Sequence, residues 1–324
     1  MTAPSWLAGV KRAIRFAFYD WTREMPPSLR VLTMIGMGIQ GYAIWAGVTR
    51  SLVWPVMWPT GLVIYPVVLL IYYFGYCIQN AALSSEFIRK TQLESEQRAA
   101  QAIQKTLQPT TIGSIPGYEV DASYTPLRAV GGDYFDVIDL ANGRTLFALA
   151  DVSGKGMPAA LLAASIQALV RSLSIASTDV AALASQINQH LCRYSPGNKF
   201  ATAVFLVLDR TSGDVVYVNA GHNPPLVWGP DPPKFLESTG MALGWFDDAP
   251  YGTGRARIAP GGGILLFTDG LPDAIPGDAP EDRLCQAIDG SLTRTMANLK
   301  ALVDPRFTED DVTVLLVKRT AAVG

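Results

Sequence analysis

Two long uncharged apolar runs near the start of the chain restrict its fold more than any other feature. The runs Val31–Val48 and Leu62–Ile78 contain no Asp, Glu, Lys or Arg. Each is long enough to cross a hydrocarbon core of about 30 Å as a helix. The tryptophans and prolines between them suit a turn at a membrane interface. We therefore expect two transmembrane helices within residues 31–78, preceded by an N-terminal segment, residues 1–30.

The basic residues around these runs predict their orientation. Only Arg50 lies between the runs, whereas Lys and Arg occur on both outer sides, at Lys11, Arg12, Arg15, Arg23, Arg30, Arg89 and Lys90. The positive-inside rule then predicts a multi-pass protein of the inner or plasma membrane, with the N-terminus and the C-terminal part in the cytoplasm. A signal peptide fits poorly, because the first run begins late and lacks a small-x-small cleavage site. A buried helical hairpin of a soluble domain remains the alternative.

The composition changes abruptly at residue 79. Residues 79–108 contain no Gly or Pro and many good helix formers, which predicts a continuous linker helix that ends before Pro109. Its apolar positions follow heptads only imperfectly. A solvated connector and a dimeric coiled coil therefore both remain open, and the second would make the chain a homodimer through this helix.

Residues 109–324 have the pattern of an α+β domain. Short β-rich runs separated by Gly, Pro and Asp predict strands on both sides of a pair of alanine-rich helices, Pro158–Ile175 and Thr178–Cys192. Further helices are expected at Glu281–Ile288 and Leu292–Leu302. Strands, a helical pair and strands again favour layered sheets.

Charge and cysteine content exclude several classes of protein. The formal net charge is -2, so no broad basic surface for nucleic acid is expected. The three cysteines, Cys77, Cys192 and Cys285, form no metal-ligand pattern, which fits a reducing compartment.

Aspartates recur where the apolar strand runs of this domain stop. They are Asp133 in VGGDYFDV, Asp151 in LADVSGKG, Asp269 in LLFTDGLPDA, and Asp310 and Asp311 in TEDDVTVLLV. A single Asp-Gly pair usually marks a turn. Carboxylates at several strand ends can instead converge at one sheet edge, where they would suit a hard cation such as Mg²⁺ or Mn²⁺. With only two histidines and no paired cysteines, zinc is disfavoured.

The glycines and lysine that follow Asp151 do not form a nucleotide-binding loop. A Walker-type loop needs G-x-x-x-x-G-K followed by Ser or Thr, whereas Lys155 lies between two glycines and is followed by Gly156 and Met157. The glycines and Pro158 suit a strand-to-helix turn. We therefore interpret the turn as one that presents Asp151.

The ordered series GGDYFDV, ADVSGKGMPAALLA, FATAVFLVLD, NAGHNPPLVW, GMALGWF, LLFTDGLPDA and DDVTVLLV resembles the SpoIIE-like, or RsbU-like, branch of the PPM-type serine/threonine phosphatases. The resemblance covers about Ile115 to Lys318, together with AIQKTLQPT just before it. The two apolar runs lie outside it.

This resemblance implies a fold, a reaction and a set of site residues. The fold would be an α-β-β-α sandwich with two Mn²⁺ or Mg²⁺ ions in a cleft at one end. Asp151 would bridge the ions beside the backbone carbonyl of Val152, and Asp269 and Asp310 would hold the second ion. Asp133 would contact metal directly or through water. Asp151 and Asp269 would thus serve catalysis through a metal-bound water that attacks the phosphoester.

The resemblance also implies a substrate. Such phosphatases typically act on a phosphoserine or phosphothreonine of a STAS-type anti-sigma-factor antagonist in partner-switching pathways. We therefore expect a membrane-anchored protein phosphatase, with the linker helix carrying a signal to the helices after Asp151.

Other residues and other protein classes are less favoured. Lys155 suits a solvated turn, and His222 and Asn223 suit a packed turn. Asp136 and Asp311 suit supporting positions, and Arg128 cannot be matched to a phosphate-binding arginine. GGDYF differs by one residue from the GGDEF signature of diguanylate cyclases, but it has Tyr134 in place of the metal-binding acid and it opens the domain. A non-enzymatic scaffold would not need the four aspartates.

Overall fold

The computed structural model describes residues 42–43, 46–47, 70, 85–109, 113–176, 179–195 and 199–321. It divides into two compact units, Met1–Ile88 and Arg89–Gly324. The two apolar runs lie outside the described residues, apart from five helical positions within them, Tyr42, Ala43, Ala46, Gly47 and Leu70. The transmembrane hairpin therefore stays a prediction.

One antiparallel sheet is built mostly from the central part of the chain. Its strand order is β2-β3-β4-β5-β8. The strands are β2 (Tyr134–Leu140), β3 (Arg144–Val152), β4 (Ala201–Asp209), β5 (Asp214–Ala220) and β8 (Gly254–Arg257). β3 and β4 are buried on both faces, which explains why they are almost continuously apolar in sequence.

The second antiparallel sheet joins the start of the domain to its end. Its order is β1-β10-β9-β6-β7. The strands are β1 (Tyr118–Thr125), β10 (Val312–Arg319), β9 (Gly263–Phe267), β6 (Leu226–Trp228) and β7 (Lys234–Phe235). Because β1 pairs with β10 over eight residue pairs, the first and last strands of the domain close the sheet together.

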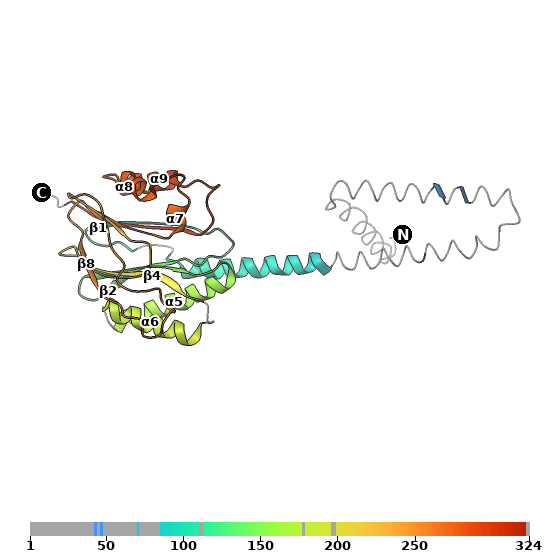
Figure 1. Cartoon of the computed structure of the whole chain (residues 1–324), viewed down its shortest axis with the longest axis horizontal. Helices are drawn as coiled ribbons and strands as arrows, with labels where there is room; N and C mark the ends of the chain where they lie inside the picture. Colours follow the sequence, from blue (N-terminus) through green and yellow to red (C-terminus); the bar gives the residue numbers. More distant parts are fainter. Residues whose placement is uncertain are drawn as a thin grey trace, which may run out of the picture. The chain divides into compact units, whose positions relative to one another are not determined.

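Helices cover the outer face of each sheet, which gives four layers (Figure 1). α5 (Met157–Ala176) and α6 (Val180–Tyr194) pack on the first sheet, and α8 (Pro280–Ala287) and α9 (Leu292–Leu302) cover the second, with the one-turn α7 (Gly270–Asp273) after β9. Three apolar cores fill the spaces between layers, and the central one contains Phe147, Leu206 and Leu315. The expected α-β-β-α sandwich is confirmed.

α5 is the one helix among the described residues with the length and hydropathy of a membrane span, over Met157–Ile175. It packs against β2 and β3, and its Ile166 and Val170 are fully buried in the core. The alanine-rich pattern that predicted a helix here therefore belongs to a core helix of the sandwich.

The strand register gives the sandwich two distinct ends. In the first sheet, Arg144 pairs with Asp209 at one end of β3, and Asp151 pairs with Thr202 at the other. In the second sheet, Arg319 ends β10, whose first residue follows Asp311. The two end residues of β10 are seven residue steps apart, a distance of about 23 Å along the strand.

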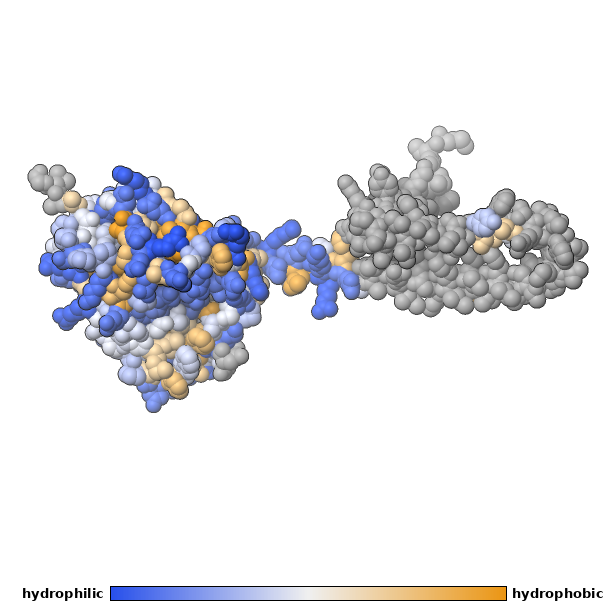
Figure 2. All heavy atoms as spheres, turned by 45° about the horizontal axis from the view of Figure 1, so that its top comes forward, coloured by the Kyte–Doolittle hydropathy of each residue, from blue (hydrophilic) through white to orange (hydrophobic). Residues whose placement is uncertain are grey.

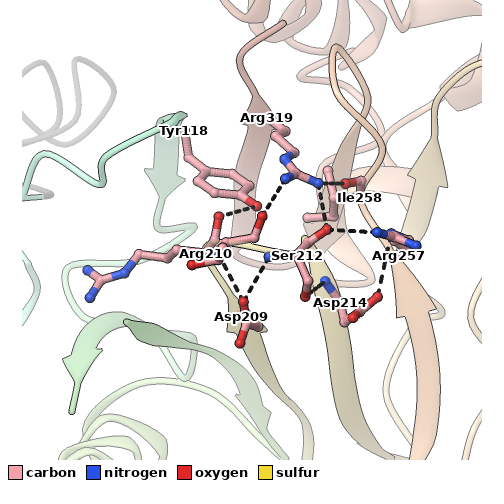
Figure 3. Close-up of polar contacts among 9 residues, drawn as sticks. Tyr118, Asp209, Arg210, Ser212, Asp214, Arg257, Ile258 and Arg319 are labelled. Carbon is pink, nitrogen blue, oxygen red and sulfur yellow. Dashed lines mark hydrogen bonds and ion pairs between the residues drawn. The ribbon is translucent and has the colours of Figure 1, made fainter. Parts of the chain in front are cut away.

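A polar clasp joins the two sheets at the end that Arg319 occupies (Figure 3). The Arg319 guanidinium donates hydrogen bonds to the backbone carbonyls of Thr211, Ser212 and Ile258, at 2.7, 2.7 and 3.1 Å. It also lies 6.0 Å from the centre of the Tyr118 ring. These contacts connect β10 to the β4–β5 turn.

The linker helix is helical over residues 85–107 of the described chain and mainly exposed. Figure 2 shows hydrophilic residues along most of its visible face. Its last turns reach the sandwich through Gln104, whose side chain donates to the carbonyl of Gly131 at 2.8 Å and accepts from its N–H at 3.2 Å. In addition, the Gln167 side chain of α5 donates to the carbonyl of Leu107.

Candidate metal centre

The four aspartates that the sequence analysis singled out come to the same end of the sandwich. Each lies just outside a strand or next to the last residue of one. Asp133 precedes β2, Asp151 is the next-to-last residue of β3, Asp269 follows β9, and Asp310 precedes β10. β3 of the first sheet and the adjacent strands β9 and β10 of the second sheet supply three of these ends, so the strand arrangement brings the carboxylates to one end of the sandwich.

Asp133 is the most buried of the set, with 3% of its surface exposed. The hydroxyl of Thr268 donates to its carboxylate at 2.9 Å, and the hydroxyl of Thr313 donates to the same oxygen. Burial raises the pKa of Asp133, and the charge of Asp151 raises it further, while the two threonines lower it. The threonines therefore fix this carboxylate from the side of the second sheet.

Asp151 has a pKa of about 7, well above the ordinary value for an aspartate. Burial is the largest cause, and the negative charges of Asp269, Asp310 and Asp311 add to it. Its carboxylate thus lies in a region of strongly negative potential. A divalent cation bound there would offset this repulsion.

Asp269 and Asp310 lie on the more open side of the cluster. Burial raises the pKa of Asp269, and so does the charge of Asp310. The Lys155 ammonium lies 2.9 Å from the Asp310 carboxylate and also donates to the backbone carbonyl of Glu309. Lys155 is an exposed turn residue, as the sequence analysis expected, and its ammonium also connects the turn after Asp151 to the opposite sheet.

Asp311 has the supporting position that the sequence analysis expected, because it holds the backbone before Asp133. Its two carboxylate oxygens accept from the N–H of Leu127 at 2.8 Å and of Gly132 at 2.7 Å. The backbone of Gly131 approaches so closely that an added Cβ would stand 2.0 Å from the Asp311 carboxylate. Only glycine fits there, so the double glycine before Asp133 was the available signal.

The backbone carbonyl of Val152 faces the same loop. A Cβ added at Gly132 would stand 2.9 Å from this oxygen, so the glycine leaves the Val152 carbonyl close to the loop that carries Asp133. Carboxylates and a carbonyl are the oxygen donors that Mg²⁺ and Mn²⁺ prefer.

The donor atoms of these residues are of the type that binds a hard cation, but they are not arranged around one position. Across the described ranges, no group of three or more His, Cys, Asp or Glu side chains is closed around a position for an ion. The carboxylates nevertheless raise one another's pKa, and Lys155 is the cation whose charge lowers the pKa of Asp269. Carboxylates that repel one another in this way suit a divalent cation as their common partner.

The remaining candidates have supporting roles or lie elsewhere. Asp136 is buried and pairs with the guanidinium of Arg171 at 2.7 and 3.0 Å. His222 is buried, and burial lowers its pKa to about 4, so its imidazole is neutral. Its Nδ1 lies 2.7 Å from the Thr202 hydroxyl, and the Asn219 side chain bonds to its backbone N–H and carbonyl. Arg128 is exposed on the loop between β1 and β2.

Comparison with known protein families gives one match. The family described as Stage II sporulation protein E (SpoIIE) matches residues 141–320. This range contains Asp151, Asp269 and Asp310 but begins after Asp133. More than half of the chain is covered.

Curated relatives cover different parts of their own lengths. The protein IcfG of Synechocystis sp. is 26% identical over 201 residues, which are 53% of this chain and 32% of IcfG. The phosphoserine phosphatase RsbU of Bacillus subtilis is 24% identical over 240 residues, which are 70% of this chain and 71% of RsbU. The chain thus spans about a third of one relative and most of the other.

Solved structures share the same architecture. The RsbU and RsbW domains of Rv1364c from Mycobacterium tuberculosis match at 29% identity with a TM-score of 0.56, covering 65% of this chain and 63% of that one. RsbX, whose crystal structure is a complex with magnesium, matches at 20% identity with a TM-score of 0.54, covering 65% of this chain and 99% of that one. The second likeness concerns the fold alone.

Proposed function

The chain belongs to the SpoIIE family of metal-dependent serine/threonine phosphatases, and from this premise we propose that it removes phosphate from a phosphoserine of a partner protein at the Asp133–Asp151–Asp269–Asp310 cluster. One observation carries the proposal. Aspartates from four separate stretches come to one end of the sandwich, where burial and then the negative charges of Asp269, Asp310 and Asp311 raise the pKa of Asp151 to about 7. A purely structural cluster would be expected to pair such carboxylates with cationic side chains.

The chain's own groups would hold two Mg²⁺ or Mn²⁺ ions, through Asp151, Asp269, Asp310, the Val152 carbonyl and, directly or through water, Asp133. When bound, such ions lower the pKa of a coordinated water and offset negative charge on phosphoryl oxygens. Asp133 is held by two threonine hydroxyls, so it can orient its neighbours without moving. Asp311 fixes the loop that carries it.

The substrate is a phosphoprotein, and a STAS-type domain in a partner-switching pathway is the class that we favour. RsbU, similar over most of its length, is named a phosphoserine phosphatase. The open side of the cluster, where Asp310 and Lys155 are each about one-third exposed, would admit a side chain displayed on another protein.

Phosphate release tests this function. The full chain in detergent or membranes is incubated with a phosphoserine-bearing STAS-type domain and, separately, with p-nitrophenyl phosphate. We expect release from both with Mn²⁺ or Mg²⁺ and none with a chelator. Release that persists unchanged in the chelator would contradict the proposal, and release from the small ester alone would contradict only the substrate class.

The membrane location is a separate part of the proposal. It rests on the two uncharged runs within residues 31–78 and on the basic residues outside them. A reporter fused after Gly324 or before Lys11 should lie in the cytoplasm, and one inserted near Arg50 should lie outside. A cytoplasmic reporter at Arg50 would exclude the hairpin.

The linker helix would carry a signal to this site. Gln104 holds the backbone of Gly131 through two hydrogen bonds, and Gly131 lies two residues before Asp133. A cavity of about 340 Å³ lies between the helix and α5, lined by Ile103, Leu107 and Leu161 among others. The contact between the linker helix and α5 is therefore incompletely packed, and pairing of two linker helices in a homodimer would move the helix relative to Gly131.

A further inference from the structure

An exposed aromatic surface lies at the same end of the sandwich as the aspartates. Trp245 and Phe246 are 56% and 54% exposed. Their rings are nearly parallel, with centres 6.4 Å apart, and Trp245 also stacks on Phe200 at 5.1 Å. We call Phe200, Trp245 and Phe246 the aromatic rim. Exposed large aromatics that stack on one another mark a surface suited to binding.

The backbone of the aromatic rim is held rigidly from below. Asn188 of α6 is 1% exposed, and its side-chain amide donates to the carbonyls of Phe246 and Asp247 at 2.8 and 3.1 Å. Its side-chain oxygen accepts from the N–H of Gly244 at 2.8 Å. One buried side chain thus fixes the backbone on both sides of two exposed rings. Rigid aromatic anchors lose little entropy on binding a partner.

The aromatic rim is continuous with the loop that follows Asp151. The N–H of Ser153 donates to the carbonyl of Phe200 at 2.9 Å, and the N–H of Phe200 donates to the Ser153 hydroxyl at 3.0 Å. Ala201 and Leu243 exchange two backbone hydrogen bonds, which attach the Trp245 loop to the start of β4. Asp151 pairs with Thr202, so only two residues of strand, about 7 Å, separate its register position from Phe200.

From these contacts we infer that the aromatic rim is the docking surface for the phosphoprotein substrate and receives an apolar surface beside its phosphoserine. This inference rests on the proposed function. One side of a standard protein interface buries about 800 Å², which corresponds to a disc of roughly 16 Å radius. A protein whose phosphoserine reaches Asp151 therefore covers the aromatic rim. A small phosphate ester reaches the same aspartates without touching it.

The test separates docking from chemistry. The double variant Trp245→Ala/Phe246→Ala is compared with wild type in the full chain. Its matched control is Ile175→Ala, because Ile175 is 86% exposed and lies about 27 Å along α5 from Met157, at the far end of that helix. For a phosphoserine-bearing STAS-type domain, we expect KM to rise roughly tenfold to thirtyfold in the double variant. For p-nitrophenyl phosphate, kcat/KM should stay within twofold, and the control should match wild type on both substrates.

A binding measurement keeps the inference testable if hydrolysis fails. The dissociation constant of the phosphorylated STAS-type domain is measured by titration against the full chain with and without the double substitution. If wild type hydrolyses neither substrate, the proposed function fails, and weaker binding by the double variant still supports docking. Trp245→Phe should restore most of the affinity, because the stacked ring is retained.

Three outcomes would overturn the inference. The first is unchanged KM and unchanged affinity for the phosphoprotein in the double variant. The second is an equal loss of activity on p-nitrophenyl phosphate, which would place the rim in the active site or in folding. The third is loss of self-association, or of binding to anionic phospholipid vesicles, with the phosphoprotein constants unchanged, because the rim would then serve a second copy or a membrane.

Discussion

Charged side chains are arranged in opposite ways at the two ends of the sandwich. At the end with Arg319, acidic and basic groups are matched: Arg210 lies 3.0 Å from Asp139, and Arg257 lies 3.5 Å from Asp214 (Figure 3 shows the second pair). Hydrogen bonds from Ser212 and Thr211 lower the pKa of Asp209 there. At the other end, burial and like charge raise the pKa values of Asp133, Asp151 and Asp269.

This difference in charge arrangement separates the end of the sandwich that stabilises the fold from the end that we propose to be the active site. Matched charges and satisfied carbonyls hold the two sheets together at one end. Clustered carboxylates at the other end cost stability, and a fold retains them when they bind something positive. The predictions below test whether the two ends behave differently, beginning with the largest expected effect.

Substituting one aspartate at each end should give the sharpest contrast. Asp151→Asn keeps the shape of the side chain but removes an anionic donor, so phosphatase activity should fall about a thousandfold or more. Asp209→Asn, at the opposite end of the neighbouring strand, should change activity less than twofold. Phosphate release with Mn²⁺ measures both, and circular dichroism checks that both fold. Equal losses of phosphatase activity in the two variants would contradict a different role for the two ends.

The pH dependence of stability should reveal the cost of keeping the buried Asp151 carboxylate charged beside the other aspartates. The pKa of Asp151 is raised to about 7 in the folded protein, so between about pH 4 and pH 7 the folded state binds more protons than the unfolded chain. Without divalent cations, stability should therefore fall as pH rises through this window, by about 1–4 kcal/mol. Thermal unfolding in chelator measures it. Added Mn²⁺ should abolish most of the fall, and a metal-free protein that is equally stable at pH 5 and pH 8 would contradict the account.

Asp311→Asn should reduce activity by roughly tenfold to a hundredfold. The carboxylate accepts from two backbone N–H groups, with one oxygen each, whereas an amide offers only one acceptor oxygen. The loop that carries Asp133 would then lose one of the two hydrogen bonds that attach it to Asp311. kcat with p-nitrophenyl phosphate measures the effect. Full activity in this variant would mean that the remaining contacts of the loop, including those of Gln104 with Gly131, position Asp133 without Asp311.

Arg319→Met should lower the stability of the domain and leave its activity unchanged. Removing the guanidinium leaves three backbone carbonyls without this donor and should lower the free energy of unfolding by about 1–2 kcal/mol. kcat should remain within twofold, because the clasp lies about 23 Å from the aspartates. Chemical denaturation and steady-state kinetics measure the two quantities. A large loss of kcat with unchanged stability would contradict the division between the ends.

The linker helix should give the smallest effects. Gln104→Ala removes both side-chain hydrogen bonds to Gly131 and should change the phosphatase rate in membranes a few fold, whereas Glu94→Ala, one of an exposed ion pair on the same helix, should not. Inserting one to four alanines between Arg98 and Gln101 rotates the helix by about 100° per residue. A periodic rise and fall in rate would support coupling, and equal rates would reduce the helix to a tether.

Much of the fold could be predicted because its long elements have clear patterns. The expected helix Leu292–Leu302 matches α9, and the apolar runs that stop at Asp151 and Asp269 are β3 and β9. The short strands β6, β7 and β8 were missed, since two to four residues are too few for a periodic pattern.

The site could be predicted only in part, for a similar reason. Strand ends identify the aspartates themselves, but contacts between distant segments carry no local signal. The pairing of Lys155 with Asp310, the hold of Asp311 on the glycine loop and the contact of Gln104 with Gly131 each join residues at least 27 positions apart. Which residues bind metal remains a prediction.

Titration of Mn²⁺ into the metal-stripped full chain by calorimetry tests the central claim most directly. The account predicts two ions bound per wild-type chain, and at least one site lost in Asp151→Asn, with both proteins folded. Mn²⁺ binding that is identical in wild type and Asp151→Asn would contradict it, because the clustered carboxylates would then not be the metal centre.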